Sequence, residues 1–466
     1  MATASAARQQ FQSPAVVPSR KKFVRLTLWP LVAATFFMVS GGTYGIEDIV
    51  HGAGYGRAIL FMVLTPLLWS LPAAFMIGEL SSALPHEGGY YAWVRRAMGN
   101  FWGFQEAWLS LVASIFDMAI YPTLFVLYLT RVFPWFAEGH RGLLVGVAVV
   151  MACTLLNVAG VRVVSTTSLG LFFLLSAPFA IIVALGPFKY GTLLHAVTRP
   201  TSSKVDLIGG LLICMWNYMG WDNASTIATE VERPQRTYPR AMLAAVVIVA
   251  LSYIVPVVAV WMTGLPAGSW ETGSWADIAG LLGGPLLRVG LVLGGMMSAF
   301  GMFNALVMSY SRLPLAMAQD GMLPRVFGKV NGRRAPWVAI VVCALGWAMC
   351  LGLGFERLIT IDILLYGSSL LLEFVALVVL RIREPGLPRE FRVPGGMLGA
   401  IAVGVAPALL LGFSVVRSQN EQVLGISSFA FGLLLMAAGV LAYFLNHALK
   451  PAGWIPAAEE KPEAVV

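Results

Sequence analysis

The stretch that decides the fold reads Val39-Ser40-Gly41-Gly42-Thr43-Tyr44-Gly45-Ile46-Glu47-Asp48 and follows a mainly apolar run, Leu26 to Met38. Glycine costs about 1 kcal/mol in a helix interior, so we expect the first membrane helix to break here. At membrane depth, lipid cannot satisfy the freed backbone groups, and such a break must be buried in protein or line a wet cavity. The stretch therefore predicts either a ligand-binding break or, more simply, a close helix contact made by glycines.

Composition places the chain in the membrane class. It has 466 residues, of which 58% are hydrophobic and 12% charged, whereas a soluble domain carries roughly 25% charged residues. Apolar runs of membrane-spanning length recur along the whole chain, which predicts an all-α integral membrane protein. No cleavable signal peptide is evident, and the polar segments 1–25 and 451–466 are predicted to be disordered cytosolic tails.

Charge and cysteine usage exclude several kinds of partner. The net charge is +8, but basic residues in a membrane protein more often mark cytoplasmic loops than a nucleic-acid surface. The four cysteines lie in apolar segments and form neither a CxxC pair nor a cluster with metal-ligand spacing. We therefore expect no metal site, no cofactor and no nucleic-acid partner, only the lipid bilayer and a small-molecule substrate.

Twelve membrane helices can be placed along the chain, and the first and the sixth of them are broken. We place them at residues 27–52, 57–83, 101–131, 142–158, 165–186, 205–230, 239–263, 285–318, 336–354, 357–380, 397–416 and 424–447. With the N-terminus inside, most of the 31 lysine and arginine residues fall on the inner side. This charge distribution predicts a multi-pass protein of the plasma membrane with both termini cytoplasmic.

The second break, Trp216-Asn217-Tyr218-Met219-Gly220-Trp221-Asp222, interrupts the sixth helix. Five helices separate one break from the next, so the second set of helices enters the membrane from the opposite side. This arrangement predicts a five-plus-five inverted repeat, with residues 26–186 as the first half, 205–380 as the second and 397–447 as an added pair. Interrupted helices at matching positions of two halves are typical of a transporter's central site.

Three further motifs carry a resemblance to a known family. The first is Gly78-Glu79-Leu80 with the stretch at 85–93, which we expect to close the second helix and enter a loop. The second is the stretch at 230–241, and the third is Ser311-Arg312 with the stretch at 316–324. Together with the breaks they resemble the amino acid–polyamine–organocation superfamily, closest to its polyamine-uptake and L-type-like branch. The resemblance implies a LeuT-like fold, alternating access around helices one and six, and substrate import that is usually coupled to protons.

The predicted substrate contacts lie at the two breaks and in the third helix. A half-helix beginning near Gly42 would point its positive end into the cavity, while freed carbonyls near Ser40 and Trp216 would suit an ammonium group. Aromatic rings at the breaks could form a cation–π box. The predicted substrate-binding residues are Ser40, Gly41, Gly42, Thr43, Tyr44, Glu47, Asp117, Trp216, Asn217, Tyr218, Trp221 and Asp222.

Carboxylates inside membrane helices are costly and usually face the bundle interior. Asp222 could bind a cation, carry a proton or simply cap the second half-helix, which we expect from Asn223 onward. Asp117 could contact substrate or satisfy a buried polar group. Glu47 and Asp48 stabilise a helix N-terminus and could attract cations, which favours an amine-rich substrate over a simple amino acid.

Two further carboxylates are candidates for coupling or gating. We expect Glu79, near the cytoplasmic end of the second helix, to belong to a gate or to form a salt bridge with a loop. Glu373 could belong to a proton path. Some proton-coupled relatives carry a lysine in the fifth helix, but residues 165–187 contain none. Sodium coupling would draw on hydroxyls of the eighth helix, where Ser298 alone is thin support, so a carboxylate is the expected proton carrier.

The sequence leaves more than one function open. We expect a proton-coupled symporter that imports a polyamine or another cationic amine, driven by the proton gradient. An amino acid permease of the same superfamily, working as a symporter or exchanger, is the alternative, and a membrane nutrient sensor is a remote one. An enzyme is not expected, because the five histidines are scattered at helix ends and loops.

Overall fold

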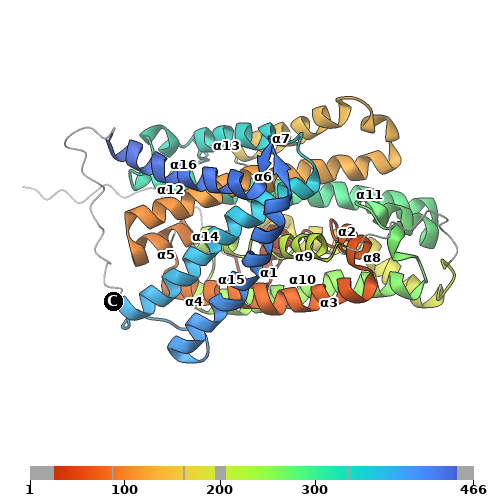
Figure 1. Cartoon of the computed structure of the whole chain (residues 1–466), viewed down its shortest axis with the longest axis horizontal. Coiled ribbons are helices and arrows are strands. Elements are labelled where there is room, and N and C mark those ends of the chain that lie inside the picture. Colours follow the sequence, from red (N-terminus) through yellow and green to blue (C-terminus); the bar gives the residue numbers. More distant parts are fainter. Residues whose placement is uncertain (1–25, 87, 161–162, 195–205, 334, 449–466) are drawn as a thin grey trace, which may run out of the picture.

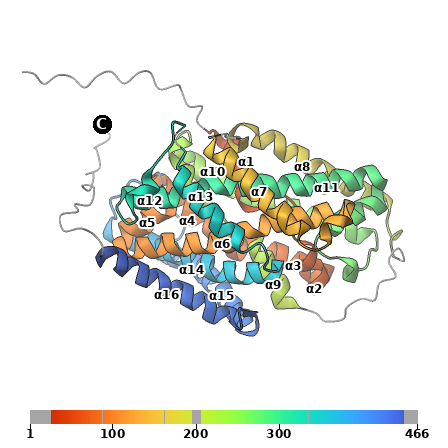
Figure 2. The same ribbon diagram turned by 90° about the horizontal axis from the view of Figure 1, so that it is seen from above.

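The chain forms a bundle of long helices in which two helices are interrupted near the centre (Figure 1). The computed structural model describes residues 26–86, 88–160, 163–194, 206–333 and 335–448. The two predicted tails, 1–25 and 451–466, lie outside the described residues. Figure 2 shows the same bundle from above, with α15 and α16 along one side.

The elements up to the first loop after α8 are α1 (Leu28–Val39), α2 (Glu47–Ala53), α3 (Tyr55–Thr65), η1 (Pro66–Ser70), α4 (Leu71–Ala83), α5 (Gly89–Met98), α6 (Asn100–Val132), η2 (Pro134–Ala137), α7 (Arg141–Val158) and α8 (Val163–Phe188). The rest are α9 (Leu207–Trp216), η3 (Asp222–Glu230), α10 (Pro234–Met262), η4 (Ala267–Ser269), α11 (Ser274–Tyr310), α12 (Arg312–Gln319), η5 (Arg325–Gly328), α13 (Trp337–Met349), α14 (Phe355–Arg383), α15 (Gly396–Asn420), β1 (Gln422–Val423), β2 (Ile426–Ser427) and α16 (Ser428–Ala448). The segment η1 is a π-helical turn inside one continuous span, Tyr55–Ala83.

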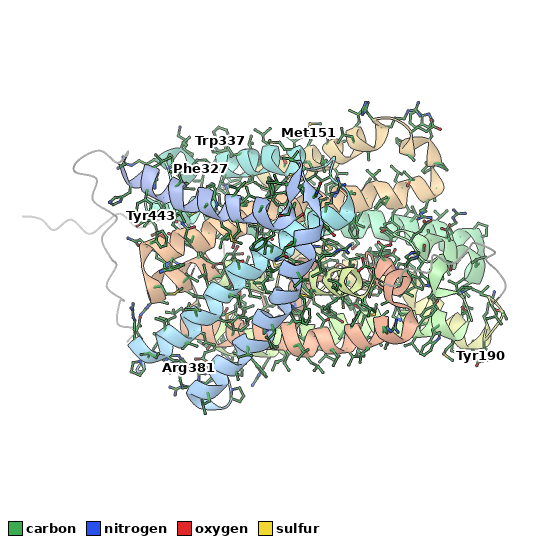
Figure 3. The ribbon with its side chains drawn as sticks, in the orientation of Figure 1. Met151, Tyr190, Phe327, Trp337, Arg381 and Tyr443 are labelled. Atoms are coloured by element: carbon green, nitrogen blue, oxygen red, sulfur yellow. The ribbon has the colours of Figure 1, made fainter. Side chains whose placement is uncertain are left out.

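Within the described ranges, nine helices are long and apolar enough to cross a membrane, and α1, α9 and α13 are shorter apolar helices. Large apolar side chains such as those of Leu286 and Met349, each 85% exposed, lie on outward faces. Figure 3 shows Met151 and Trp337 on the outside of the bundle in the same way. Such a surface is unfavourable in water but suits contact with lipid chains.

Two predicted boundaries are wrong. The helix predicted at 285–318 begins at Ser274, because Gly284, with φ of 78°, and Pro285 kink α11 without ending it. The predicted loop after the second helix contains a short helix, α5, which begins after a left-handed Gly88 and ends before Gly99. The other predicted spans begin and end within a few residues of the observed elements.

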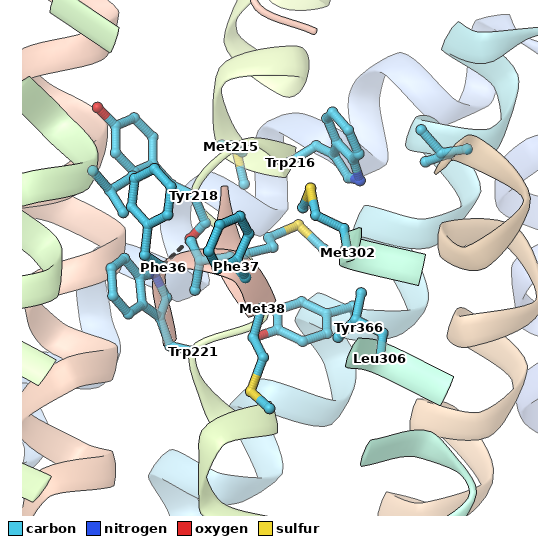
Figure 4. Packing of buried hydrophobic residues seen from close by; sticks show 14 of the residues in the cluster. Phe36, Phe37, Met38, Met215, Trp216, Tyr218, Trp221, Met302, Leu306 and Tyr366 are labelled. Carbon is cyan, nitrogen blue, oxygen red and sulfur yellow. Dashed lines mark hydrogen bonds between the residues drawn. The ribbon is translucent and has the colours of Figure 1, made fainter. Parts of the chain in front are cut away.

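The centre of the bundle is packed by side chains from both interrupted helices. Phe36 and Met38 from α1 belong to the same buried cluster as Met215 from α9 and Met302 from α11 (Figure 4). These side chains are 0–5% exposed. Tight packing at this point fixes where α1 and α9 end, which is where each break begins.

Candidate functional site

The first break separates α1, which ends at Val39, from α2, which begins at Glu47. Gly41, Gly42 and Gly45 adopt φ values of 60°, 114° and 87°, a region that L side chains rarely adopt. The chain therefore stays out of helix for seven residues, 40–46. The prediction that the second half-helix begins near Gly42 is wrong for this reason.

Other helices satisfy the backbone carbonyls that the first break sets free. The indole Nε1 of Trp275 donates to the Thr43 carbonyl at 2.8 Å, and the Asn217 side-chain amide donates to the Gly45 carbonyl at 3.2 Å. The Ser298 hydroxyl donates to the Gly41 carbonyl. These three carbonyls, of which that of Gly41 lies next to Ser40 where the sequence suggested a partner for an ammonium group, are thus already hydrogen-bonded within the protein.

The fully buried carboxylate of Glu47 stabilises the first break by accepting hydrogen bonds. Its Oε2 accepts from the Gly45 amide at 2.7 Å, and its Oε1 accepts from the Gly273 amide at 3.0 Å and from the Tyr128 hydroxyl. The Tyr44 ring packs edge-on against the Tyr128 ring, with centroids 5.2 Å apart. Neither Glu47 nor Tyr44 is among the residues that line the central cavity.

The second break separates Trp216, the last residue of α9, from Asp222, the first residue of η3, one residue before the predicted start. The Tyr253 hydroxyl donates to the Asn217 carbonyl at 2.8 Å. The Tyr218 hydroxyl donates to a carbonyl of α3, and the Trp221 indole donates to the Tyr218 carbonyl at 2.7 Å. Tyr218 and Trp221 are therefore packed and hydrogen-bonded inside the protein, as Figure 4 also shows.

A small cavity lies between the end of α1, the second break and the helices α6, α11 and α14. Its free volume is about 10 Å³, which is about the room that one water molecule needs. Met38, Val39 and Met219 supply apolar lining. Of the four predicted aromatic residues only Trp216 reaches it. A larger ligand therefore requires the lining side chains or helices to move.

Asp117, on α6, lines this cavity and is hydrogen-bonded from three sides. The Tyr121 hydroxyl and the Trp216 indole donate to its Oδ1 at 2.9 and 3.3 Å, and the Tyr310 hydroxyl donates to its Oδ2 at 3.2 Å. The sequence left open whether Asp117 contacts substrate or satisfies a buried polar group, and the structure places its carboxylate beside Trp216 at the second break. The carboxylate both faces the cavity and holds α6, α9 and α11 together.

Asp222 lies behind the cavity wall. Its Oδ1 accepts from the Tyr366 hydroxyl at 2.5 Å, and that hydroxyl in turn accepts from the Gly220 amide at 3.0 Å. Tyr366 lines the cavity, whereas Asp222 does not. The structure thus connects Asp222 to the cavity through the Tyr366 side chain of α14.

Two buried carboxylates near this region were missed by the sequence reasoning. Asp362, one turn before Tyr366 on α14, lines the cavity, and its Oδ2 has no hydrogen-bond partner among the described residues. Glu106, on α6, accepts from the Ser369 hydroxyl at 2.5 Å. Both interrupt apolar helices, which is the same signal that singled out Glu373. The Glu373 carboxylate is fully buried, and neither oxygen has a partner within the described chain.

Glu79, at the end of the bundle that carries α5, forms the predicted loop salt bridge. Its carboxylate pairs with Arg381 at the end of α14 and with Arg389 at 3.2 Å, and it accepts from the Val393 amide at 2.7 Å. Glu79 and both arginine side chains are largely buried. Figure 3 shows Arg381 at the opposite end of the bundle from Tyr190.

The sequence of this chain is similar to a family of known proteins. A sequence model of the family described as "Amino acid permease" matches residues 32–444. The chain is 34% identical to Polyamine transporter RMV1 of Arabidopsis thaliana over 95% of this chain and 90% of the relative. It is 34% identical to Polyamine transporter PUT1 of Oryza sativa subsp. japonica over 96% and 85%. It is 25% identical to the Serine/threonine exchanger SteT of Bacillus subtilis over 90% and 94%.

Proposed function

Because this chain belongs to the amino acid permease family of membrane transporters, we propose that it imports a polyamine or another cationic amine by alternating access. The observation that carries the proposal is the charge of the cavity. Two of its lining residues, Asp117 and Asp362, are acidic, and no described lining residue is basic. An ammonium group would compensate these buried carboxylates, whereas the carboxylate of a neutral amino acid would find no positive partner there.

The architecture that we propose is twelve spans in a LeuT-like five-plus-five inverted repeat. Its support is that nine long helices and three shorter apolar ones occur in the described chain, with breaks after α1 and within the α9–η3 segment. The first half would be residues 26–186, the second 205–380, and 397–447 the added pair. Interrupted helices that meet at the centre of such a fold are typical of transporter sites.

We propose that Asp117 and Trp216 contact the substrate directly and that Asp222 acts through Tyr366. The remaining predicted residues would shape the breaks and let them move. This group comprises Ser40, Gly41, Gly42, Thr43, Tyr44, Glu47, Asn217, Tyr218 and Trp221. Its support is that the described break residues bond mainly to one another and to neighbouring helices.

Proton coupling is proposed through Glu373. A buried carboxylate without partners is unfavourable in its charged form unless a proton or a cation compensates it, and Glu373 has no described partner. We further propose a plasma-membrane protein with both termini cytoplasmic. The α5 end of the bundle would then be the inner end, where Glu79 and Arg381 would form part of a gate.

An amino acid substrate is the alternative, and one comparison favours it. The Serine/threonine exchanger SteT is similar to this chain over nearly its whole length. A nutrient sensor on the same scaffold remains a remote alternative. A transport assay separates all three, because a sensor would bind its ligand without moving it across the membrane.

The test is uptake into proteoliposomes with an inward proton gradient, using labelled spermidine, putrescine, arginine and leucine. We expect uptake of the amines, and we expect Asp117→Asn and Asp222→Asn to reduce it strongly. Glu390→Gln serves as the matched control, since Glu390 pairs with Arg236 on the exposed surface. Uptake of leucine alone, unaffected by Asp222→Asn, would overturn the cationic-substrate proposal.

A further inference from the structure

The carboxylate of Asp362 differs from that of Asp117, although both line the same cavity. Asp117 receives three hydrogen bonds from neutral donors. Asp362 is 2% exposed, and its Oδ2 has no partner among the described residues. A buried polar atom without a partner is costly, and a charged one more so. Its charged form therefore needs a proton or a cation to compensate it, and because Asp362, unlike Glu373, lines the cavity, a cation bound there can do so.

The two carboxylates belong to different walls of the cavity. Asp117 comes from α6, whereas Asp362 comes from α14 together with Tyr366, which is one helical turn further along. The rest of the lining combines apolar and aromatic side chains, among them Met38, Trp216 and Met219, with the polar side chain of Asn223. Figure 4 shows Met38, Trp216 and Tyr366 in this region. Apolar side chains suit a methylene chain, and the faces of aromatic rings suit an ammonium group.

We propose that Asp362 is a second ammonium subsite, and that the cavity selects substrates with two amino groups joined by a methylene chain. One ammonium group would pair with Asp117 and the other with Asp362 Oδ2. This inference rests on the proposed transport of cationic amines, and it deepens that proposal by assigning a residue to the second charge. An amine with one charge would leave Asp362 uncompensated and would bind more weakly.

The test compares putrescine with butylamine, which has the same number of carbons in its chain but only one amino group. Binding is measured as competition against labelled spermidine in the full-length reconstituted protein. We expect putrescine to bind roughly tenfold more tightly than butylamine or better, because a hydrogen bond to a charged group contributes at least that much. This comparison needs no variant and so does not depend on the folding of one.

Asp362→Asn should remove the preference by weakening putrescine binding and leaving butylamine binding unchanged, while Asp362→Glu should keep part of it. The apparent melting temperature of ligand-free Asp362→Asn should not fall, because the change removes no hydrogen bond made by Oδ2. Equal loss of both ligands, or no loss of either, overturns the Asp362 subsite even if the protein transports amines. Failure of the wild-type protein to bind any amine would instead overturn the proposed function itself.

Discussion

At the scale of single residues, the buried carboxylates fall into groups with different surroundings. Glu79 has two arginine partners, Glu47 has backbone and tyrosine donors, and Asp362 and Glu373 have oxygens without any described partner. A satisfied carboxylate holds structure in place, whereas an unsatisfied one is available to a ligand or a proton. The same residue type is therefore paired at one end of the bundle and left without described partners at its centre.

Glu79→Gln should destabilise the protein by about 3–5 kcal/mol, because it leaves Arg381 and Arg389 buried with no carboxylate between them. The measurement is the apparent melting temperature in detergent. Glu384→Gln is the matched control, since it removes a carboxylate that pairs with Arg96 on the exposed surface and should cost about 0–1 kcal/mol. Equal effects of the two substitutions would contradict a structural role for the Glu79 ion pairs.

At the scale of elements, the positive φ values of the glycines interrupt the helix at the first break, and side chains of neighbouring helices pack against the interruption. Gly41 lies against the side chains of Met302 and Ser298, both from α11, and it needs a positive φ of 60°. The break is thus a tight contact between helices as well as an interruption. The simpler interpretation raised by the sequence, close packing by glycines, is part of how the site is built.

Gly41→Ala should impair both stability and transport. A positive φ costs a residue with a side chain about 1–2 kcal/mol, and the added methyl group would also displace Met302. Gly290→Ala is the control, because that glycine lies within α11 and has open space around it. The measurement is spermidine uptake together with the apparent melting temperature. A fully active Gly41→Ala protein would show that the break tolerates a different backbone.

Sequence patterns could predict the breaks but not what fills them. Glycines and polar residues inside apolar runs are local signals, so both interruptions were found within a few residues. The donors that satisfy the first break, Trp275 and Asn217, lie far along the chain, and no local pattern connects them to it. Asp362 interrupts an apolar helix as Glu373 does and so could have been found by the same signal, but only the fold brings it to the cavity that Asp117 lines.

At the scale of the whole molecule, α14 carries two carboxylates with oxygens left unpaired in the described chain, Asp362 and Glu373, and Arg381 near its end. One helix thus carries Asp362 and Tyr366, which line the cavity, the buried Glu373, and Arg381, which pairs with Glu79. A proton taken up at Glu373 would change the charge balance along this helix. Coupling between protonation and cavity opening is therefore expected to run through α14.

Glu373→Gln should abolish the stimulation of uptake by an inward proton gradient while preserving exchange of labelled for unlabelled amine. The wild-type protein should take up amine faster as the external pH falls below the internal pH, since protonation of Glu373 from outside would accompany inward movement. Parallel assays of gradient-driven uptake and of exchange measure the two activities in one preparation. A variant that still responds to the gradient would assign coupling to another group.

The cost of leaving carboxylates unpaired has a consequence for the lifetime of the protein. Any ligand that binds only the folded state shifts the folding equilibrium toward that state. A transporter whose central site is completed by a bound cation should therefore be stabilised by its own substrate. Abundant amine should protect it from thermal inactivation and proteolysis, and scarcity should shorten its half-life, so that the amount of carrier follows the supply of what it carries.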